Sequence, residues 1–476
     1  MVGREKEIDE LNRLYDGKQA ELVAIYGRRR VGKTYLVDET FGDRITFRHA
    51  GLSPEVADSK GMLATQLAHF YNSLRLAGME PCEKPNSWLD AFLLLELFLQ
   101  RIDDGSRQLV FLDELPWLDT PRSGFMAAFE GFWNAWACHR KNLMVVVCGS
   151  ANSWILDKMV NNHGGLYNRV TYEIKLRPFT LRECEEFFGS SGVRLSRYDI
   201  VQSYMIFGGI PYYLGYMRGD MSLAQNVDNM VFARDAKLKF EYDRLFSSVF
   251  TNPEAVKGIV ELLYTRSVGF TRKEMTERLG IGDGGGLTRN LNALIASDFV
   301  VKYVPFGASK RNEHYKLVDP FCIFYLHFVN GKKGVSESFW QSNVTSQSVS
   351  SWRGLAFEEV CFNHIDQIKM ALGIAGVIAE CSAWSKKCDD EAGAQIDLLI
   401  SRNDNVVNMC ELKFYSDEFC VDGDYYRTLL HRQDVLGGEV LKKTSVHSTL
   451  ITTFGLKRNE YSGIFTNVLT LDDLFR

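Results

Sequence analysis

The octapeptide GRRRVGKT at residues 27–34 constrains the fold of this chain more than any other segment. It follows the apolar run ELVAIY at residues 21–26 and precedes YLVDETF, which suits a helix. The order of strand, glycine-rich loop and helix, with G-x-x-x-x-G-K-[ST] spacing, predicts a P-loop in a parallel α/β sheet. Such a loop points its backbone N–H groups at the phosphates of a bound nucleotide.

Each position of this loop has an expected task in binding Mg-ATP. Gly27 and Gly32 permit the tight backbone turn. We expect Lys33 to reach the β- and γ-phosphates and Thr34 to provide a hydroxyl ligand for Mg²⁺. The predicted nucleotide-binding residues are Gly27, Arg28, Arg29, Arg30, Val31, Gly32, Lys33, Thr34 and, from a later strand, Ser150.

Two acidic residues follow a second apolar run, LVFL at residues 109–112. We expect Asp113 to hold Mg²⁺ through its waters, from a strand neighbouring that of the P-loop. Glu114 is then placed to polarise the attacking water as general base. A solvated strand end is the other interpretation of an Asp-Glu pair, but the P-loop upstream favours the catalytic one.

A third apolar run, LMVVVCGS at residues 143–150, ends in Ser150, with Asn152 two residues further on. In a parallel sheet this polar end lies near the γ-phosphate, where it would sense or orient water. An ordinary strand-to-loop turn is the alternative. Arg169 is a candidate arginine finger that neutralises charge on the transferred phosphoryl group, although most arginines are surface charges.

Seven features in a fixed order resemble the archaeal-type ATPase family, which is related to the AAA+ and STAND proteins. They are VGREKEIDEL, the P-loop, the FLDE strand, the strand ending in GS, LYNRV, KLRPFT and GGIPYYL. The resemblance covers residues 2–330. It implies an αβα nucleotide domain followed by a helical lid around residues 179–250, with Gly3 and Arg4 near the adenine.

The same resemblance bears on the arginine finger and on the lid. Arg169 matches the position where the family has a glycine-arginine pair, although Asn168 replaces the glycine in this chain. The GGIP segment at residues 208–211 carries no arginine that would act as a second sensor. Whether the lid responds to the nucleotide is therefore left open by the sequence.

Short helices follow from Glu254 onward. AVKGIVELLYTRS and the run at residues 270–279, with Thr271 as N-cap, predict two helices, and LTRNLNALIAS predicts a third. The run FVVKYVPFGASKRNEHYKLV predicts a β-hairpin with a polar tip at residues 307–312. Three helices and a hairpin predict a winged helix over residues 251–330.

The basic residues of this segment leave its role undecided. The third helix offers Arg289, flanked by Asn290 and Asn292, and the hairpin tip offers Lys310 and Arg311. DNA binding generally needs several phosphate contacts. Winged helices also serve as spacers and as docking units for proteins. We therefore keep DNA contact and a structural role as alternatives.

A serine-rich stretch at residues 336–351 is expected to be a linker to the last domain. WRGLAFEEVCFNHI then predicts an amphipathic helix that carries Glu358 and Glu359, with Leu355 among its apolar positions. Two strands follow, QIDLLIS and VVNMCELKFY, separated by a short turn. This helix-strand-strand order predicts an α/β domain over residues 331–476.

Three polar side chains lie on these two strands. Glu411 and Lys413 are separated by one residue and so point to the same face, where Asp397 would meet them across the strands. Two carboxylates and a lysine in this arrangement would bind Mg²⁺ and hold a nucleophilic water. An acid followed by an alternating lysine is also common on ordinary exposed strands.

This constellation resembles the PD-(D/E)XK nuclease superfamily, in which Asp397 corresponds to the first acid and residues 411–413 to the (D/E)XK half. The resemblance implies that Glu358 or Glu359 is the helical acid that often precedes the core. It further implies a restriction-endonuclease-like fold, which the archaeal-type ATPase family frequently carries. Many members of that fold serve only as scaffolds.

Composition limits the partners and the compartment. The chain has 476 residues, too many for one ordinary core, and a net charge of −5, so any nucleic-acid binding must come from a local patch. A charged N-terminus and short apolar runs indicate no signal peptide and no membrane span. The ten scattered cysteines predict reduced thiols in a cytoplasmic protein.

These expectations combine into an α/β chain of four parts. They are an ATPase core at residues 1–178, a lid at 179–250, a winged helix at 251–330 and a nuclease-like domain at 331–476. We expect an ATP-hydrolysing, DNA-associated enzyme whose nucleotide state controls the last domain. A non-cleaving signalling switch and a transcription regulator are the alternatives, and supply of Arg169 by a neighbouring subunit would imply a homo-oligomer.

Overall fold

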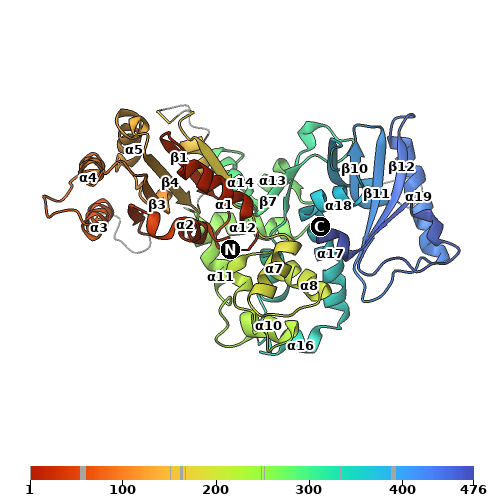
Figure 1. Ribbon diagram of the computed structural model, residues 1–476. Helices are drawn as coiled ribbons and strands as arrows, with labels where there is room; N and C mark the ends of the chain where they lie inside the picture. The colour runs from red at the N-terminus through yellow and green to blue at the C-terminus, as the bar shows by residue number, and fades with distance from the viewer. Residues whose placement is uncertain are drawn as a thin grey trace. The chain divides into compact units, whose positions relative to one another are not determined.

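The fold was examined in a computed structural model of the chain (Figure 1). The residues that the structure describes are 2–53, 61–150, 152–160, 165–166, 168–247, 249–250, 252–332, 334–386 and 393–476. The chain divides into two compact units. Unit 1 consists of Met1–Arg177, Leu245–Pro253 and Arg289–Asp298. Unit 2 consists of Pro178–Arg244, Glu254–Thr288 and Phe299–Arg476.

The described residues of unit 1 form a five-stranded sheet in which all paired strands are parallel. Its strands are β1 (Glu21–Tyr26), β2 (Phe47–Ala50), β3 (Gln108–Asp113), β4 (Leu143–Gly149) and β5 (Tyr172–Lys175). The three apolar runs predicted as strands are confirmed as β1, β3 and β4. The order β2-β3-β4-β1-β5 corrects one expectation, because β4 lies between the P-loop strand and the strand that carries Asp113.

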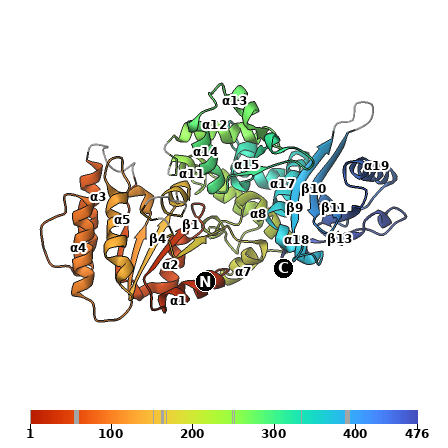
Figure 2. The same cartoon turned by 90° about the horizontal axis from the view of Figure 1, so that it is seen from above.

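Helices cover both faces of this sheet, which explains why its three central strands, β3, β4 and β1, are apolar on both sides. The helices of unit 1 are α1 (Glu5–Tyr15), α2 (Lys33–Phe41), α3 (Met62–Leu76), α4 (Trp88–Arg101), α5 (Phe125–Ala135) and α6 (Asn152–Ile155). Leu22 and Ala24 of β1 share one hydrophobic cluster with buried residues of α3, α4 and α5. Helices α1 and α2 lie on the other side (Figure 2).

Unit 2 begins with short helices in the region predicted as a lid. They are α7 (Leu181–Ser190), α8 (Arg197–Phe207), α9 (Pro211–Leu214) and α10 (Leu223–Val227), followed by α11 (Glu241–Ser247), which has residues in both units. Serine and threonine begin several of them. The hydroxyl of Thr180 accepts from the N–H of Glu183 in a capping box, which satisfies N–H groups that the first turn leaves unpaired.

The segment predicted as a winged helix, residues 251–330, contains helices and three short strands in its described part. They are α12 (Pro253–Tyr264), β6 (Phe270–Thr271), α13 (Arg272–Leu279), α14 (Gly285–Ala296), β7 (Val300–Tyr303) and β8 (His314–Leu317). Thr271 caps α13, as predicted, but Phe270 lies in β6 and not in the helix. The described strands pair antiparallel in the order β6-β8-β7, so the predicted hairpin is confirmed.

The C-terminal residues of unit 2 form a mixed sheet in the order β13-β12-β11-β10-β9. Its strands are β9 (Ala379–Lys386), β10 (Ala394–Arg402), β11 (Val406–Lys413), β12 (Ser445–Thr452) and β13 (Asn467–Leu469). The remaining helices are α15 (Pro320–Phe328), α16 (Phe339–Asn343), α17 (Gln347–Asn363), α18 (Ile365–Ala371), α19 (Gly423–Glu439) and α20 (Leu471–Leu474). Helices α17 and α19 cover opposite faces of the sheet (Figure 1).

The serine-rich stretch at residues 336–351 is not a linker, which corrects the sequence interpretation. It contains α16 and the start of α17, where the hydroxyl of Ser346 accepts from the N–H of Val349 as an N-cap. Trp340 is buried, and its N–H donates to the carboxylate of Asp228 at 2.7 Å. The helix face was also misjudged in part, because Leu355 is 55% exposed.

Across the described residues, none of the helices has both the length and the apolar composition needed to cross a membrane.

Candidate functional site

The loop between β1 and α2 has the backbone geometry that phosphate binding requires. Gly27 has φ 152°, and a Cβ at this position would lie 2.2 Å from the carbonyl oxygen of Leu176. Gly32 begins α2 in the left-handed region at φ 91°. Glycine is needed at both positions, for space at the first and for backbone conformation at the second.

Lys33 lies inside this loop. Its Nζ donates to the carbonyl oxygens of Gly27 at 3.0 Å and Arg28 at 3.3 Å, and to the hydroxyl of Ser150 at 3.3 Å. Burial lowers the pKa of Lys33, because desolvation disfavours the ammonium form. An ammonium group surrounded by neutral oxygens binds an arriving phosphate strongly, since the phosphate brings the compensating negative charge.

Thr34 and Asp113 meet at the ends of α2 and β3. The Thr34 hydroxyl donates to the Asp113 carboxylate at 2.8 Å. Burial raises the pKa of Asp113, because desolvation disfavours the carboxylate form. A hydroxyl and a carboxylate oxygen are ligand types that Mg²⁺ prefers, so this pair fits the predicted metal position.

The carboxylate of Glu114 is bonded to Ser150, and the sequence did not indicate this contact. The Ser150 hydroxyl donates to Glu114 Oε1 at 2.6 Å, and the Ser150 N–H donates to Oε2 at 3.0 Å. Glu114 has φ 45°, a conformation that a non-glycine residue rarely adopts. Because β4 lies between β1 and β3, Ser150 connects Lys33 to Glu114 by two hydrogen bonds.

Asn152 makes contacts that differ from those of the predicted water sensor. Its Oδ1 accepts from the N–H of Gly27 at 2.8 Å, and its Nδ2 donates to the carbonyl of Ala296 at 3.0 Å. The residue is fully buried. Asn152 therefore connects the first glycine of the loop to the last residue of α14, both of which belong to unit 1.

The other predicted residues of unit 1 lie further from these hydrogen bonds. Asn168 has φ 53°, in the left-handed region, which asparagine tolerates better than most residues. The side chain of Arg169 is exposed. Arg4 is buried and donates to the carbonyl of Arg177 at 2.7 Å. The roles of Arg169, Gly3 and Arg4 stay predictions.

Comparison with known proteins agrees with this geometry. Residues 1–217 match the family described as an ATPase domain predominantly from Archaea. Over these residues the chain is similar to an archaeal-type ATPase domain. The glycine-rich loop and the side chains of Lys33, Thr34 and Glu114 all lie within the residues that match this family.

Similar proteins extend over more of the chain. An uncharacterized protein of Methanocaldococcus jannaschii is 23% identical over 444 residues, which is 92% of each chain. The solved Walker-type ATPase of Pyrococcus abyssi is 17% identical, with a TM-score of 0.45, over 68% of this chain and 96% of that one. The ORC2 protein of Aeropyrum pernix is 14% identical, with a TM-score of 0.41, over 73% and 96%.

The predicted C-terminal acids come together at the end of the β10–β11 pair. Leu398 pairs with Cys410 in the antiparallel register, which places Asp397 next to Glu411. Lys413 Nζ lies 3.5 Å from Glu411 Oε2, so these two side chains share a face, as predicted. Burial raises the pKa of Asp397, and the charge of Glu411 raises it further.

Glu411 has two partners on α19 that the sequence interpretation missed. The guanidinium Nη1 of Arg432 lies 2.5 Å from Glu411 Oε1, and the Tyr425 hydroxyl donates to Glu411 Oε2 at 2.5 Å. Glu411 itself is fully buried. Tyr425 and Arg432 are seven positions apart, which places them on one face of a helix, but this spacing does not indicate that the face lies against Glu411.

Glu358 and Glu359 of α17 have different surroundings. Glu359 forms an ion pair with Lys316 and is buried. Glu358 lines a cavity of about 840 Å³ together with Asp397 and Lys413. Burial raises the pKa of Glu358 to about 8, with a further contribution from the charge of Asp397. Glu358 is therefore the helical acid that faces the strands.

A metal ion does not fit the C-terminal acids in the arrangement present. Within the described ranges, no three His, Cys, Asp or Glu side chains are grouped as metal ligands. Both oxygens of Glu411 are bonded, and Arg432 already supplies the positive charge that a metal would bring. Asp397 and Glu411 would hold a metal only after Glu411 exchanges these partners, and their metal role stays a prediction.

The basic residues predicted for DNA contact are at the surface of their elements. Arg289 and Asn292 of α14 are exposed, and Asn290 is half-buried. Arg311 is exposed at the hairpin tip. The side chain of Lys310 lies outside the described part of the chain.

Proposed function

We propose that this chain hydrolyses Mg-ATP and that its nucleotide state controls a C-terminal domain directed at DNA. The observation that carries the first half is the pair of hydrogen bonds from Lys33 through Ser150 to Glu114. It links the side chain expected at the γ-phosphate to the side chain expected at the attacking water. The arrival of the phosphate at Lys33 therefore changes the bonding of the general base.

Hydrolysis follows from the roles of these side chains. Lys33 exchanges its carbonyl partners for β- and γ-phosphate oxygens, and the N–H groups of the loop bind the same phosphates. Glu114, held in place by the hydroxyl and N–H of Ser150, orients the attacking water and accepts its proton. Arg169, from this chain or from a neighbouring subunit, neutralises charge on the transferred phosphoryl group.

Magnesium has a place in this scheme at Thr34 and Asp113. When bound there, it supplies positive charge to the phosphate oxygens and orients them for attack. Thr34 would hold it through its hydroxyl and Asp113 through waters. The 2.8 Å hydrogen bond between these two side chains supports the assignment, because both point to one position.

The remaining elements support a DNA-associated architecture. Helices α12, α13 and α14 with the β7–β8 hairpin have the order of a winged helix, and exposed Arg289 and Arg311 are its candidate phosphate contacts. The mixed sheet with α17 and α19 on its faces suits a restriction-endonuclease-like domain. Helix α14 has residues in both units, which makes it a candidate path of control.

Control of the C-terminal domain would act on Glu411. Cleavage by Asp397, Glu411 and Lys413 requires Glu411 to exchange its bonds to Arg432 and Tyr425 for other partners. A non-cleaving switch is the second candidate function, and the same ion pair favours it, because Arg432 neutralises the acid that nuclease chemistry needs. A transcription regulator that acts through the winged helix is a variant of this second candidate.

Turnover of ATP in Glu114→Gln tests the first half of the proposal. We expect phosphate release to fall while ATP binding persists, since glutamine keeps the shape but loses the proton acceptor. Unchanged turnover in this variant would refute the role of Glu114.

Cleavage of DNA with Mg²⁺ or Mn²⁺, with and without ATP, tests the second half. The comparison is between the unaltered chain and Glu411→Ala/Lys413→Ala. Cleavage that survives the double change contradicts the nuclease assignment. Turnover of ATP without any cleavage supports the switch. Loss of DNA binding in Arg289→Ala/Arg311→Ala supports the regulator.

A further inference from the structure

The cavity beside the C-terminal acids is lined along one side by a regular stripe of α17. The stripe consists of Gln347, Ser350, Ser351, Gly354, Leu355 and Glu358. Their spacing of three and four residues is that of one helix face. The serine and glycine residues of this stripe are small, so they leave room beside the helix. The serine hydroxyls and the glutamine amide can form hydrogen bonds with a ligand there. The stripe ends at Glu358, which faces Asp397.

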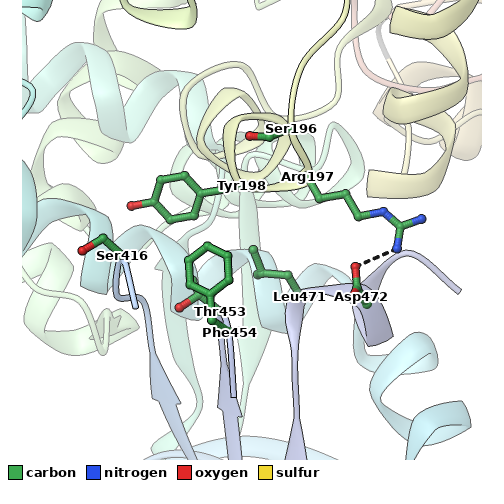
Figure 3. A pocket seen from close by; sticks show the side chains of 8 residues that line it. All are labelled: Ser196, Arg197, Tyr198, Ser416, Thr453, Phe454, Leu471 and Asp472. Carbon is green, nitrogen blue, oxygen red and sulfur yellow. Dashed lines mark hydrogen bonds and ion pairs between the residues drawn. The ribbon is translucent and has the colours of Figure 1, made fainter. Parts of the chain in front are cut away.

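Helix α8 bounds the same cavity with Tyr198 and Gln202. The ring of Tyr198 stacks on Phe414, with centroids 4.9 Å apart at 9°, and also contacts the ring of Phe454 at 5.6 Å. The preceding residue, Arg197, bonds to Asp472 at 2.8 Å. Figure 3 shows this contact, with the α8 residues opposite those that follow β11 and β12. These rings and charges fix α8 against the sheet and close one side of the cavity.

Two cations and one exposed ring line the cavity. Arg353 is half-buried, and no hydrogen-bond acceptor for its Nε lies among the described residues. Lys413 contributes the second cation, and Tyr415, at 51% exposure, contributes the ring. Guanidinium and ammonium groups bind phosphodiesters, and exposed aromatic rings stack on unpaired bases.

We propose that this cavity binds a single strand of nucleic acid, with phosphates at Arg353 and Lys413 and an unpaired base on Tyr415. The inference rests on the proposed function, because it names the substrate class of the same acidic site. A bound strand would lie along the α17 stripe, with a phosphodiester near Glu358 and Asp397.

The size of the cavity excludes paired DNA or RNA. About 840 Å³ is the volume of a pocket for a drug-sized ligand, which corresponds to one or two nucleotides. A duplex buries its bases in the stack and presents only their edges, so it offers no free ring face to Tyr415.

Binding of labelled oligonucleotides to the full chain in EDTA tests this proposal without cleavage. A 12-residue single strand is compared with a hairpin of the same sequence, each as DNA and as RNA. We expect both single strands to bind at least tenfold more tightly than the hairpins. With two phosphate contacts, an increase from 50 to 200 mM salt should weaken single-strand binding about sevenfold.

Two variants locate the binding site. Arg353→Ala should flatten the salt dependence, because it removes one phosphate contact, and Tyr415→Ala should weaken binding about tenfold through loss of stacking. The matched controls are Arg427→Ala and Tyr172→Ala, which change exposed residues that do not line the cavity and should leave binding unchanged.

The outcomes separate this inference from the proposed function. Equal or tighter binding of the hairpins overturns it, as does single-strand binding that Arg353→Ala and Tyr415→Ala leave intact. Cleavage of duplex with no single-strand preference would overturn the substrate class while supporting the nuclease. Single-strand binding at the cavity without cleavage would support the inference while refuting the nuclease.

Discussion

The two acidic sites of this chain hold their glutamates in opposite ways. In unit 1, Glu114 accepts hydrogen bonds from the hydroxyl and N–H of Ser150, both of which are neutral. In unit 2, Glu411 is bonded to the guanidinium of Arg432 and to Tyr425. Neutral donors leave the negative charge of a carboxylate available to a cation, whereas an ion-paired arginine compensates it.

The carboxylate of Glu114 is therefore available to a water or a cation, whereas that of Glu411 is already neutralised. At the P-loop, Thr34 and Asp113 meet through a hydrogen bond at the predicted metal position. At the C-terminal cavity, Glu411 is bonded to Arg432 and Tyr425 of the same domain. Breaking each set of bonds in turn shows whether the distinction governs function.

The largest expected effect comes from Lys33→Ala. Loss of the buried ammonium removes the phosphate contact and the link to Ser150, and phosphate release at saturating ATP should fall about 10³-fold. Lys141→Ala, a change at an exposed lysine of the same unit, is the control. A residual rate within tenfold of the unaltered chain would show that the P-loop lysine does not serve turnover.

Removal of the cation at the second site should cost stability. In Arg432→Met the buried carboxylate of Glu411 loses its nearer cation and keeps only Lys413, at 3.5 Å, and the free energy of unfolding should fall by about 3 kcal/mol. Urea denaturation measures the loss. The double change Arg432→Met/Glu411→Gln should recover most of it, because it removes the uncompensated charge. Equal free energies of unfolding for all three proteins would show that the ion pair does not contribute to stability.

A buried histidine adds pH dependence to unit 2. His364 accepts from the N–H of Leu181 at 3.0 Å, contacts the carbonyl of Val360 through Nδ1 at 2.7 Å and is fully buried. Burial lowers the pKa of His364 to about 4. Between about pH 6.5 and 4 the unfolded chain therefore binds the proton that the folded chain excludes, so stability falls as the pH falls.

The expected loss attributable to His364 is about 3 kcal/mol across this interval. Urea denaturation at pH 7 and at pH 4.5 should show a smaller difference for His364→Gln than for the unaltered chain. Burial also lowers the pKa of His49 in unit 1, to about 3, and that contribution is common to both proteins. Identical pH slopes would rule out the assignment to His364.

The smallest effect is expected at the hydroxyl between the lysine and the base. Ser150→Ala removes the donor to Glu114 Oε1 but keeps the backbone donor, so kcat should fall about tenfold with KM nearly unchanged. Steady-state kinetics separate the two parameters. An unchanged kcat would mean that the backbone N–H alone orients Glu114.

Local patterns allowed much of this structure to be predicted. The P-loop and its flanking strand and helix, the Thr271 cap and the β10–β11 pair each depend on residues close in sequence. Periodicity and capping act over a few residues, so one sequence reveals them. The same holds for the shared face of Glu411 and Lys413.

Features that depend on distant parts of the chain were not predictable in this way. The position of β4 between β1 and β3 depends on how the crossovers are arranged, and it alone brings Ser150 to Glu114. The partners of Glu411 come from a helix that follows the strand by many residues. The serine-rich stretch was misread because serine is typical of loops and of helix caps alike.

The two hydrogen bonds of Asn152 couple the free energy of the P-loop conformation to the position of α14. Both ends of the Asn152 amide are bonded: Oδ1 accepts from the Gly27 N–H, and Nδ2 donates to the Ala296 carbonyl. A reversed amide would face acceptor to acceptor and donor to donor, so the side chain has a single favourable orientation. A ligand that binds the loop conformation in which the Gly27 N–H donates to Asn152 also stabilises the bond from Asn152 to Ala296 of α14, by thermodynamic linkage. Conversely, displacement of Ala296 weakens the binding free energy of that ligand by the same amount.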